Sequence, residues 1–188
     1  MPAERKTAIV TGAASGMGRA MALGLSEAGF DVVAVDRNAG ALETLPASIK
    51  PLAADLAQPD SFEKIVSETL NAFGRIDILV NNAGIGQAGI RADQRSNPIR
   101  FWEVTPEQWN RFQTVNATAP IMMSLAVLPH MLKANSGRIV TVTTSLGTMV
   151  REGYLLYGSS KASAESAMAV LAADLKGTGI TSNVLVPG

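Results

Sequence analysis

The sequence predicts an α/β fold in which a parallel sheet is covered by helices. Short, continuously apolar runs recur along the chain, and amphipathic or alanine-rich stretches separate them. The first two runs, Thr7–Thr11 and Asp31–Asp36, are joined by a glycine-rich turn and a helical stretch, which is a βαβ pattern. Apolar runs without alternation are typical of strands buried on both faces of a parallel sheet. The 188 residues are expected to form one domain, 1–188.

Composition and charge exclude several classes of function. Sixteen basic and sixteen acidic residues give a net charge of zero, so neither nucleic acid nor a membrane surface is an expected partner. The chain has no Cys and one His, His130, which excludes disulfides and any Cys- or His-rich metal site. The apolar run before Gly12 is too short for a signal peptide, and the longest apolar stretch, Ala119 to Leu132, falls short of a membrane span. We therefore expect a cytoplasmic protein without a metal.

The first βαβ unit contains a turn suited to a pyrophosphate. The strand Thr7–Thr11 precedes it and a helix over Arg19–Ala28 follows it, with the spacing Gly-x-x-x-Gly-x-Gly between them. Small residues let the backbone approach phosphates, and a helix N-terminus offers unpaired N–H groups and a positive dipole end. The turn residues expected at the cofactor are Gly12, Ser15, Gly16, Met17 and Gly18. The alternative is a tight strand-to-helix turn that binds nothing.

Asp36 sets the predicted cofactor preference. It ends the second strand, 36 − 12 = 24 residues after Gly12, close to where a carboxylate hydrogen-bonds the adenine ribose of NAD. The same carboxylate would repel a 2′-phosphate, and Arg37 would offset only part of that repulsion. The sequence therefore favours NAD over NADP. The alternative is that Asp36 is a solvated residue at the end of a strand.

Two more strands lead to a predicted ligand-binding edge. The strand Ile49–Ala54 is followed by an amphipathic helix from Phe62 to Phe73, which Gly74 closes, and then by the strand Ile76–Val80. Open α/β sheets bind ligands beyond the carboxyl ends of their strands. The residues expected there are Asp55, Leu56, Asn82, Ala83 and Gly84.

The segment Ile85–Val104 has no regular pattern and carries Arg91, Arg95 and Arg100. Two interpretations are open: a lid that contacts an anionic substrate, or a solvated surface loop. The surface loop is favoured, because connecting segments ordinarily run over the protein surface.

A long helix is predicted to begin at Thr105. Thr105 as N-cap, Pro106 in the first turn and Gln108 form a capping box. The helix continues towards Leu132 with Asn116 in its middle, where a polar residue needs a use. Pro120 lacks the N–H that would bond the carbonyl of Asn116, so that carbonyl is predicted to be open to water.

An acid/base pair is predicted after the fifth strand, Ile139–Val142. Tyr157 and Lys161 lie four residues apart, one helical turn. A phenol titrates near ~10, and lowering its pKa by about three units costs roughly 4 kcal/mol. One ammonium at ~4 Å in a partly buried site supplies about that much. The pair is therefore suited to moving a hydroxyl proton, although Tyr and Lys at this spacing also occur on ordinary surface helices. A sixth strand, Ser182–Val186, follows.

Taken together, the motifs resemble those of the short-chain dehydrogenase/reductase family, in the family's own order over essentially all 188 residues. The motifs are Thr11-Gly12-x-x-x-Gly16-x-Gly18, Asp55-Leu56, Asn81-Asn82-Ala83-Gly84, Asn116, Tyr157-x-x-x-Lys161 and Pro187-Gly188. The resemblance implies a single Rossmann-type doubly wound parallel sheet that binds a nicotinamide cofactor. It also implies that Tyr157 is the general acid/base, that Lys161 lowers its pKa and holds the nicotinamide ribose, and that Asn116 anchors a relay water. Pro187 and Gly188 would also contact the cofactor.

The sequence departs from the family pattern in two places. The family has a catalytic Ser thirteen residues before the Tyr, and here 157 − 13 = 144 gives Thr144, while Ser145 lies at twelve. Either hydroxyl therefore remains a candidate to hold the substrate oxygen. Family members also continue past Pro-Gly with a substrate-covering segment and a seventh strand, so we expect this chain to be a C-terminally incomplete part of a longer product.

The leading hypothesis is an NAD-dependent oxidoreductase that moves a hydride between the nicotinamide and a carbinol or carbonyl carbon. A nucleotide-binding or structural protein without catalysis, and an epimerase or lyase using transient oxidation, are the alternatives. The substrate would be a small alcohol or ketone with apolar character, because Leu146–Leu156 is partly hydrophobic. The helices Pro106–Leu132 and Tyr154–Lys176 are rich in Ala, Met and Leu, and in the family they form dimer and tetramer interfaces, so we expect a homo-oligomer.

Overall fold

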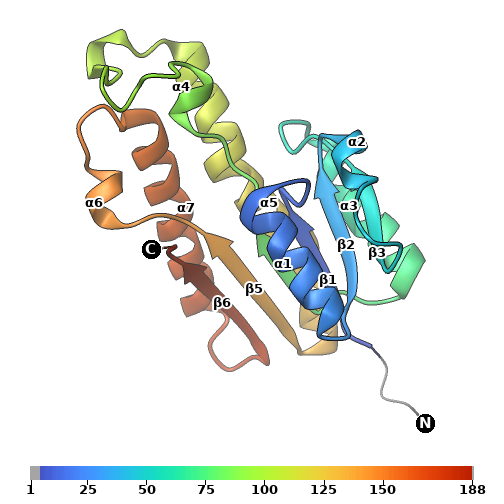
Figure 1. Cartoon of the computed structure of the whole chain (residues 1–188). Coiled ribbons are helices and arrows are strands. Elements are labelled where there is room, and N and C mark those ends of the chain that lie inside the picture. The colour runs from blue at the N-terminus through green and yellow to red at the C-terminus, as the bar shows by residue number, and fades with distance from the viewer. Residues whose placement is uncertain (1–4, 188) are drawn as a thin grey trace.

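The computed structural model describes residues 5–187 and shows six parallel strands in one sheet, in the order β3-β2-β1-β4-β5-β6 (Figure 1). The strands are β1 (Thr7–Thr11), β2 (Asp31–Asp36), β3 (Ile49–Ala53), β4 (Ile78–Asn81), β5 (Gly137–Val142) and β6 (Ile180–Leu185). The chain builds the sheet outward from β1 in one direction and then returns to build from β4 in the other. The order reverses between β1 and β4, so the segments that follow these two strands run in opposite directions and leave a crevice at their carboxyl ends. Doubly wound sheets bind ligands in this crevice. The predicted Rossmann-type α/β fold is confirmed.

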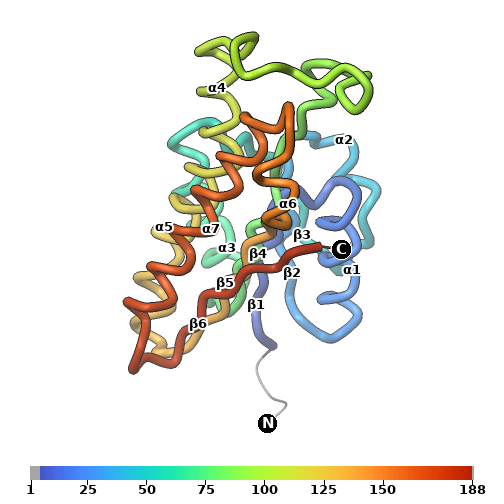
Figure 2. The backbone as a smooth tube through the Cα atoms, turned by 90° about the vertical axis from the view of Figure 1, so that its left-hand side faces the viewer, coloured from blue at the N-terminus to red at the C-terminus, as the bar shows by residue number. Residues whose placement is uncertain are grey.

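Helices cover both faces of the sheet (Figure 2). They are α1 (Gly16–Glu27), α2 (Ala39–Leu42), α3 (Asp60–Phe73), α4 (Pro106–Gln113), α5 (Ala119–Ala134), α6 (Leu146–Met149) and α7 (Leu155–Asp174). Side chains alternate along β1: Val10 packs in the cluster that includes residues of α1 and α2, whereas Ile9 packs with residues of α3, α5 and α7. The continuous apolar strands of the sequence are thus buried on both faces.

Most predicted boundaries lie within two residues of the observed ones, and the start of α1 differs by three. Helix α1 begins at Gly16, three residues before the predicted start, so the last part of the glycine-rich turn is already helical. Strand β4 begins at Ile78, two residues after the predicted start, and the carboxylate of the preceding Asp77 accepts from the backbone N–H of Thr7 (2.8 Å).

The long helix predicted from Thr105 is interrupted by a π-helical turn. Its start is confirmed: Thr105 accepts from the N–H of Gln108 (3.3 Å), and the Gln108 side chain accepts from the N–H of Thr105 (3.1 Å). Residues Thr114–Thr118, which include Asn116, form the π-helical turn between α4 and α5. Such turns inside α-helices are frequent at functional sites.

The apolar stretch Ala119 to Leu132, predicted to fall short of a membrane span, is part of a longer helix. Within residues 5–187, one helix, Pro106–Ala134, is long and apolar enough to cross a membrane, and half of its most apolar 18-residue stretch is buried in the fold. Its α5 part packs Met123, Val127 and Met131 against the sheet, and each of them is fully buried. Its apolar character is therefore that of a core helix.

The segment Ile85–Val104 lies beside the site and is more buried than a solvated loop. It carries short 3-10 turns at Gln87–Gly89 and Phe101–Glu103, and it buries Gln87, Gln94 and Ile99. Arg91 pairs with Glu103 (3.1 Å) and Arg100 with Glu152, so these two guanidinium groups already have carboxylate partners.

Candidate functional site

The glycine-rich turn after β1 depends on the absence of side chains at two positions. Gly12 has φ +67°, and a Cβ on it would lie 2.8 Å from Cα of Ala83. A Cβ on Gly18 would lie 2.1 Å from the carbonyl oxygen of Gly12, which no rearrangement of a side chain can relieve. At Gly16, with φ +54°, a Cβ would meet open space, so its backbone is accessible to a ligand. The turn is thus shaped for close backbone approach, as a pyrophosphate requires.

Asn82 ties this turn to the end of β4. Its side-chain amide donates to the carbonyls of Thr11 (3.0 Å) and Gly12 (3.3 Å). In return, the Thr11 hydroxyl accepts from the N–H groups of Asn82 (3.0 Å) and Ala83 (3.1 Å). These bonds join residues about seventy positions apart and fix both sides of the crevice in one arrangement.

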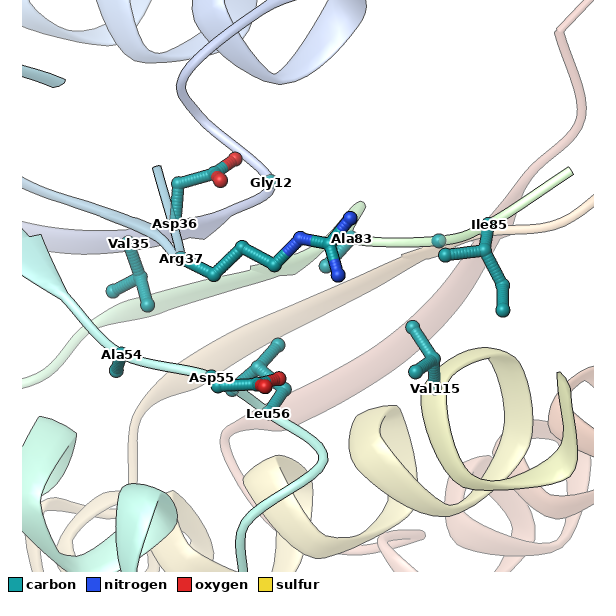
Figure 3. A pocket seen from close by; sticks show the side chains of 11 residues that line it. Gly12, Val35, Asp36, Arg37, Ala54, Asp55, Leu56, Ala83, Ile85 and Val115 are labelled. Atoms are coloured by element: carbon teal, nitrogen blue, oxygen red, sulfur yellow. The ribbon is translucent and has the colours of Figure 1, made fainter. Parts of the chain in front are cut away.

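A cleft at the end of β2 holds the remaining predicted cofactor residues (Figure 3). Its lining includes Gly12, Asp36, Arg37, Asp55, Leu56, Ala83 and Gly84. The carboxylate of Asp36 accepts from the N–H groups of Ala14 (3.2 Å) and Asn38 (3.0 Å), which fixes its direction. The side chain of Arg37 extends along the cleft beside Ala83. The cleft therefore offers two carboxylates, Asp36 and Asp55, and one guanidinium, Arg37, beyond the carboxyl ends of β2 and β3.

A second hollow, of about 440 Å³, lies further along the crevice and contains the predicted catalytic groups. Tyr157, Lys161 and Thr144 all line it, together with Met17, Asn82, Gly84 and Pro187 from the cofactor set. Tyr157 and Lys161 are on successive turns of α7, and Thr144 follows β5. The end of β5 and the first turns of α7 thus bring a residue with a hydroxyl, one with a phenol and one with an ammonium to the same hollow.

The structure distinguishes Thr144 from Ser145. The Ser145 hydroxyl is the N-cap of α6: it accepts from the N–H of Thr148 (3.3 Å) and donates to the Thr148 hydroxyl (3.2 Å). Ser145 is not among the residues that line the hollow, whereas Thr144 is. The geometry therefore favours the register with Thr144 thirteen residues before Tyr157.

The expected lowering of the Tyr157 pKa by Lys161 is not observed. Burial, with a smaller contribution from Tyr154, raises the pKa of Tyr157 above its ordinary value. The Lys161 ammonium lies 5.9 Å from the centre of the Tyr157 ring and donates to the carbonyl of Val142 (2.8 Å). Burial lowers the pKa of Lys161 itself to about 8. The sequence argument assumed a closer charge and did not include the cost of burying both groups.

Asn116 lies in the π-helical turn, next to the hollow that contains the predicted catalytic groups. Its side-chain oxygen accepts from the N–H of Ile85 (2.8 Å), and its amide donates to the carbonyl of Ile85 (3.0 Å) and the hydroxyl of Ser160 (3.1 Å). Its side chain connects the end of β4 to α7 and lies next to Gly84, where an added Cβ would be 3.3 Å from the Asn116 oxygen and 3.4 Å from the Lys161 nitrogen.

Three predicted residues have a less defined position. Ser15 is the exposed N-cap residue of α1 and makes no side-chain capping bond. Met17 is half exposed and lines the larger hollow. Gly188 lies outside the described residues. Within residues 5–187 there is no cluster of three His, Cys, Asp or Glu residues able to hold a metal ion.

Sequence reasoning missed several polar residues around the catalytic wall. Gln87, 3% exposed, accepts from the N–H of Tyr157 (3.3 Å) and donates to the carbonyl of Gly153. Glu165 accepts from the buried hydroxyl of Thr143 (2.9 Å), next to Thr144. Glu165 could have been predicted from the sequence, because it continues the four-residue spacing of Tyr157 and Lys161 along one face of the helix. Gln87 gave none, since it lies in a segment without a pattern.

The fold and the site define a dinucleotide-binding α/β protein with a Tyr-Lys pair in the crevice. The family model described as short chain dehydrogenase matches residues 6–188. The chain belongs to the short-chain dehydrogenase/reductase family, whose members are nicotinamide-dependent oxidoreductases acting on small molecules.

Three similar proteins illustrate this membership. A short chain dehydrogenase of Pseudocercospora fijiensis is 38% identical over 97% of this chain and 59% of its own length. The 3-oxoacyl-(acyl-carrier-protein) reductase FabG of Escherichia coli is 34% identical over 98% of this chain and 73% of its own length. A crystal structure of a metagenomic short-chain oxidoreductase in complex with NADP superposes with a TM-score of 0.87 at 28% identity, covering 97% of this chain and 82% of the other. The chain thus spans about three fifths to three quarters of the curated relatives named here.

Proposed function

We propose that this chain is the cofactor-binding and catalytic part of an oxidoreductase that transfers a hydride between a nicotinamide and the carbinol or carbonyl carbon of a small substrate. The observation that carries the proposal is the hollow in which Tyr157, Lys161 and Thr144 meet next to the glycine-rich turn. A nicotinamide dinucleotide supplies the hydride chemistry. The residues that would hold it are the backbone at Gly12–Gly18, Asp36 for the ribose and Asn82–Gly84 at the end of β4. Lys161 would hold the second ribose.

Tyr157 acts as the group that gives or takes the substrate proton. Because its pKa is raised in the buried site, its phenol is protonated at neutral pH and is ready to donate to a carbonyl oxygen. The hydroxyl of Thr144 would hold the same oxygen, since a Thr hydroxyl can donate as a Ser hydroxyl does. In the reverse direction, the phenol must first lose its proton, and a cationic Lys161 would favour that loss.

Lys161 and Asn116 would connect the phenol to solvent. Lys161, with its pKa lowered to about 8, changes charge more readily than an exposed lysine and is suited to passing a proton. The side chain of Asn116 already bonds Ile85 and Ser160, so a relay water would use the carbonyl of Asn116, which Pro120 leaves without its usual helical donor.

The preferred cofactor is NAD. Its support is the Asp36 carboxylate, oriented by the N–H groups of Ala14 and Asn38, which would accept from a ribose diol and repel a 2′-phosphate. Arg37 beside it works against that preference, and the metagenomic oxidoreductase with a similar fold was solved with NADP. The ratio of the Kd values for NADH and NADPH tests this choice, and Asp36→Ala is expected to move it towards NADPH.

We further propose a cytoplasmic homo-oligomer. Helices α5 and α7 expose Leu125 (54%), Leu132 (50%) and Val170 (58%) on their outer surfaces, and apolar surface of this kind suits helix packing between subunits. A monomeric mass by light scattering would contradict the oligomer.

The decisive test of the activity is Tyr157→Phe. The variant keeps the ring and loses the phenol, so NADH and NADPH should still bind while turnover of alcohols and ketones falls by about a thousandfold or more. Cofactor binding followed by NADH fluorescence provides the control for folding. Activity at the wild-type level in this variant would refute the assigned role.

A further inference from the structure

A second phenol lies in the same hollow as Tyr157. Tyr154 immediately precedes α7 and lines the hollow together with Tyr157 and Thr144. The two rings meet edge to face, with their centres 6.4 Å apart and an interplanar angle of 84°. The hydroxyl of Tyr154 makes no hydrogen bond to Tyr157 or to Thr144, although Tyr154 makes a small contribution to the raised pKa of Tyr157.

Gln94 holds the hydroxyl of Tyr154. Its side-chain amide donates to the Tyr154 oxygen (3.3 Å), from the segment that carries the 3-10 turns and from sixty residues away in sequence. Gln94 is 8% exposed and lines the same hollow, and its side-chain oxygen has no partner among the described residues. Burying an unpaired polar group costs about 1–3 kcal/mol, and an apolar residue would fill the space without that cost. We therefore attribute the buried amide of Gln94 to its role in positioning the Tyr154 phenol.

The Tyr154 hydroxyl retains hydrogen-bonding capacity for a ligand. A phenol can donate one bond and accept others, and Gln94 uses one acceptor position. No acceptor for the Tyr154 hydroxyl is found among residues 5–187. Arg151 lies over the ring, 5.4 Å from its centre, and contacts the face of the ring and not the hydroxyl. The remaining proton of Tyr154 is thus free for an oxygen of a molecule in the hollow.

We propose that Tyr154, positioned by Gln94, is a specificity-determining residue that selects substrates with a second oxygen close to the reacting carbon, such as a diketone or a hydroxyketone. The inference rests on the proposed function, because the reacting oxygen is placed by Tyr157 and Thr144. Tyr157 and Thr144 take the carbonyl that is reduced, and Tyr154 donates to the neighbouring oxygen. A ketone without the second oxygen would leave the Tyr154 hydroxyl unpaired in the complex, and this is a strong source of discrimination.

The test compares 2,3-butanedione and 3-hydroxy-2-butanone with 2-butanone, which has the same carbon chain and one oxygen. The reductions are measured as kcat/KM with NADH and with NADPH, in the wild-type chain, in Tyr154→Phe and in Gln94→Leu. For each variant, the kcat/KM of each dioxygenated ketone is divided by that of 2-butanone. Because these ratios are compared between variants, the intrinsic reactivities of the ketones cancel. Loss of one hydrogen bond predicts that the preference for the two dioxygenated ketones falls about tenfold in Tyr154→Phe. Gln94→Leu keeps the Tyr154 phenol and removes its hydrogen-bond partner, so the preference should fall in this variant too, but by less than in Tyr154→Phe.

Trp102→Phe is the matched control. Trp102 is 82% exposed and lines a different hollow, so its replacement should leave every ratio unchanged. If 2-butanone is reduced but the ratios in Tyr154→Phe and Gln94→Leu equal those of the wild type, the role of Tyr154 is refuted and the proposed function stands. If the wild-type chain reduces none of the three ketones with either cofactor, the proposed function fails and this inference fails with it.

Discussion

The two halves of the sheet shape the proposed site by different means. In the half built from β1, β2 and β3, the backbone does most of the work: Gly12 and Gly18 are required because a Cβ would collide with neighbouring backbone. In the half built from β4, β5 and β6, buried side chains such as Asn116 and Lys161 hold the site through hydrogen bonds to segments far along the chain. The difference teaches that the glycine-rich turn is set by close approach of backbone, part of it from about seventy residues away, whereas the Tyr-Lys side is set by hydrogen bonds of buried side chains.

The largest expected effect is on the backbone half. Gly18→Ala places a Cβ 2.1 Å from the carbonyl oxygen of Gly12, so the turn must shift. We expect a loss of about 3 kcal/mol in the free energy of unfolding, with loss of NADH binding. Gly24→Ala is the control in the same helix, because a Cβ there meets nothing within 4 Å, and it should stabilise the protein by about 0.5 kcal/mol. Urea unfolding measures both, and equal stabilities would remove the steric argument.

The second prediction addresses the side-chain half. Thr144→Val removes the hydroxyl from the catalytic wall and is expected to lower kcat/KM about a hundredfold, the effect of losing one donor to a reacting oxygen. Ser145→Ala instead removes the N-cap of α6 and should cost about 1 kcal/mol of stability with activity nearly retained. Steady-state kinetics and thermal unfolding of the pair separate the two roles. The opposite pattern would restore Ser145 as the catalytic hydroxyl.

A third prediction tests the seam between the halves. Asp77, just before β4, accepts from the N–H of Thr7 at the start of β1 and from two nitrogens of Arg75 (2.7 Å each). Burial acts to raise the pKa of Asp77, but these bonds outweigh it and hold the pKa below its ordinary value. Asp77→Asn should therefore cost about 2 kcal/mol at neutral pH.

The pH dependence of the stability lost in Asp77→Asn follows from the direction of the Asp77 pKa shift. A carboxyl with a depressed pKa stabilises the fold above its ordinary pKa, near ~4, and that contribution is lost as the pH falls further. The stabilities of wild type and Asp77→Asn should converge in acid, as followed by urea unfolding from pH 7 to pH 3. A difference that stays constant down to pH 3 would contradict the ionic account.

The smallest expected effect is a stabilisation, and it concerns the replacement of Lys161. Burial lowers its folded-state pKa from 10.5 to about 8, so carrying the ammonium at neutral pH costs folding free energy. Lys161→Met removes this cost and also the bond to Val142, and a net gain of about 1 kcal/mol at pH 7 is expected. Because the cost is fully present below the folded pKa and fades as the pH rises towards the unfolded value, the gain should shrink above about pH 8 and become a net loss before pH 10.5, where only the missing bond to Val142 counts. Thermal unfolding across this range measures it, and a variant less stable than wild type at pH 7 would show that the hydrogen bond outweighs the buried charge.

The sequence by itself determined the local features. The β-branched runs formed the predicted strands, and Thr105 and Gln108 formed the predicted capping box, because each depends on residues within a few positions. The glycine spacing located the turn after β1, although the shape of that turn also depends on Asn82 and Ala83. The order of the motifs also indicated the family before any contact was known.

Only the tertiary structure decided the chemistry of the wall. It placed Thr144, and not Ser145, on the lining of the hollow, raised the pKa of Tyr157 where one neighbouring charge had predicted a lowering, and placed Gln94 against Tyr154. These outcomes depend on burial and on partners tens of residues away, and neither is a property of a spacing pattern. A motif can name the groups that meet, whereas their protonation and bonding are set by what packs around them.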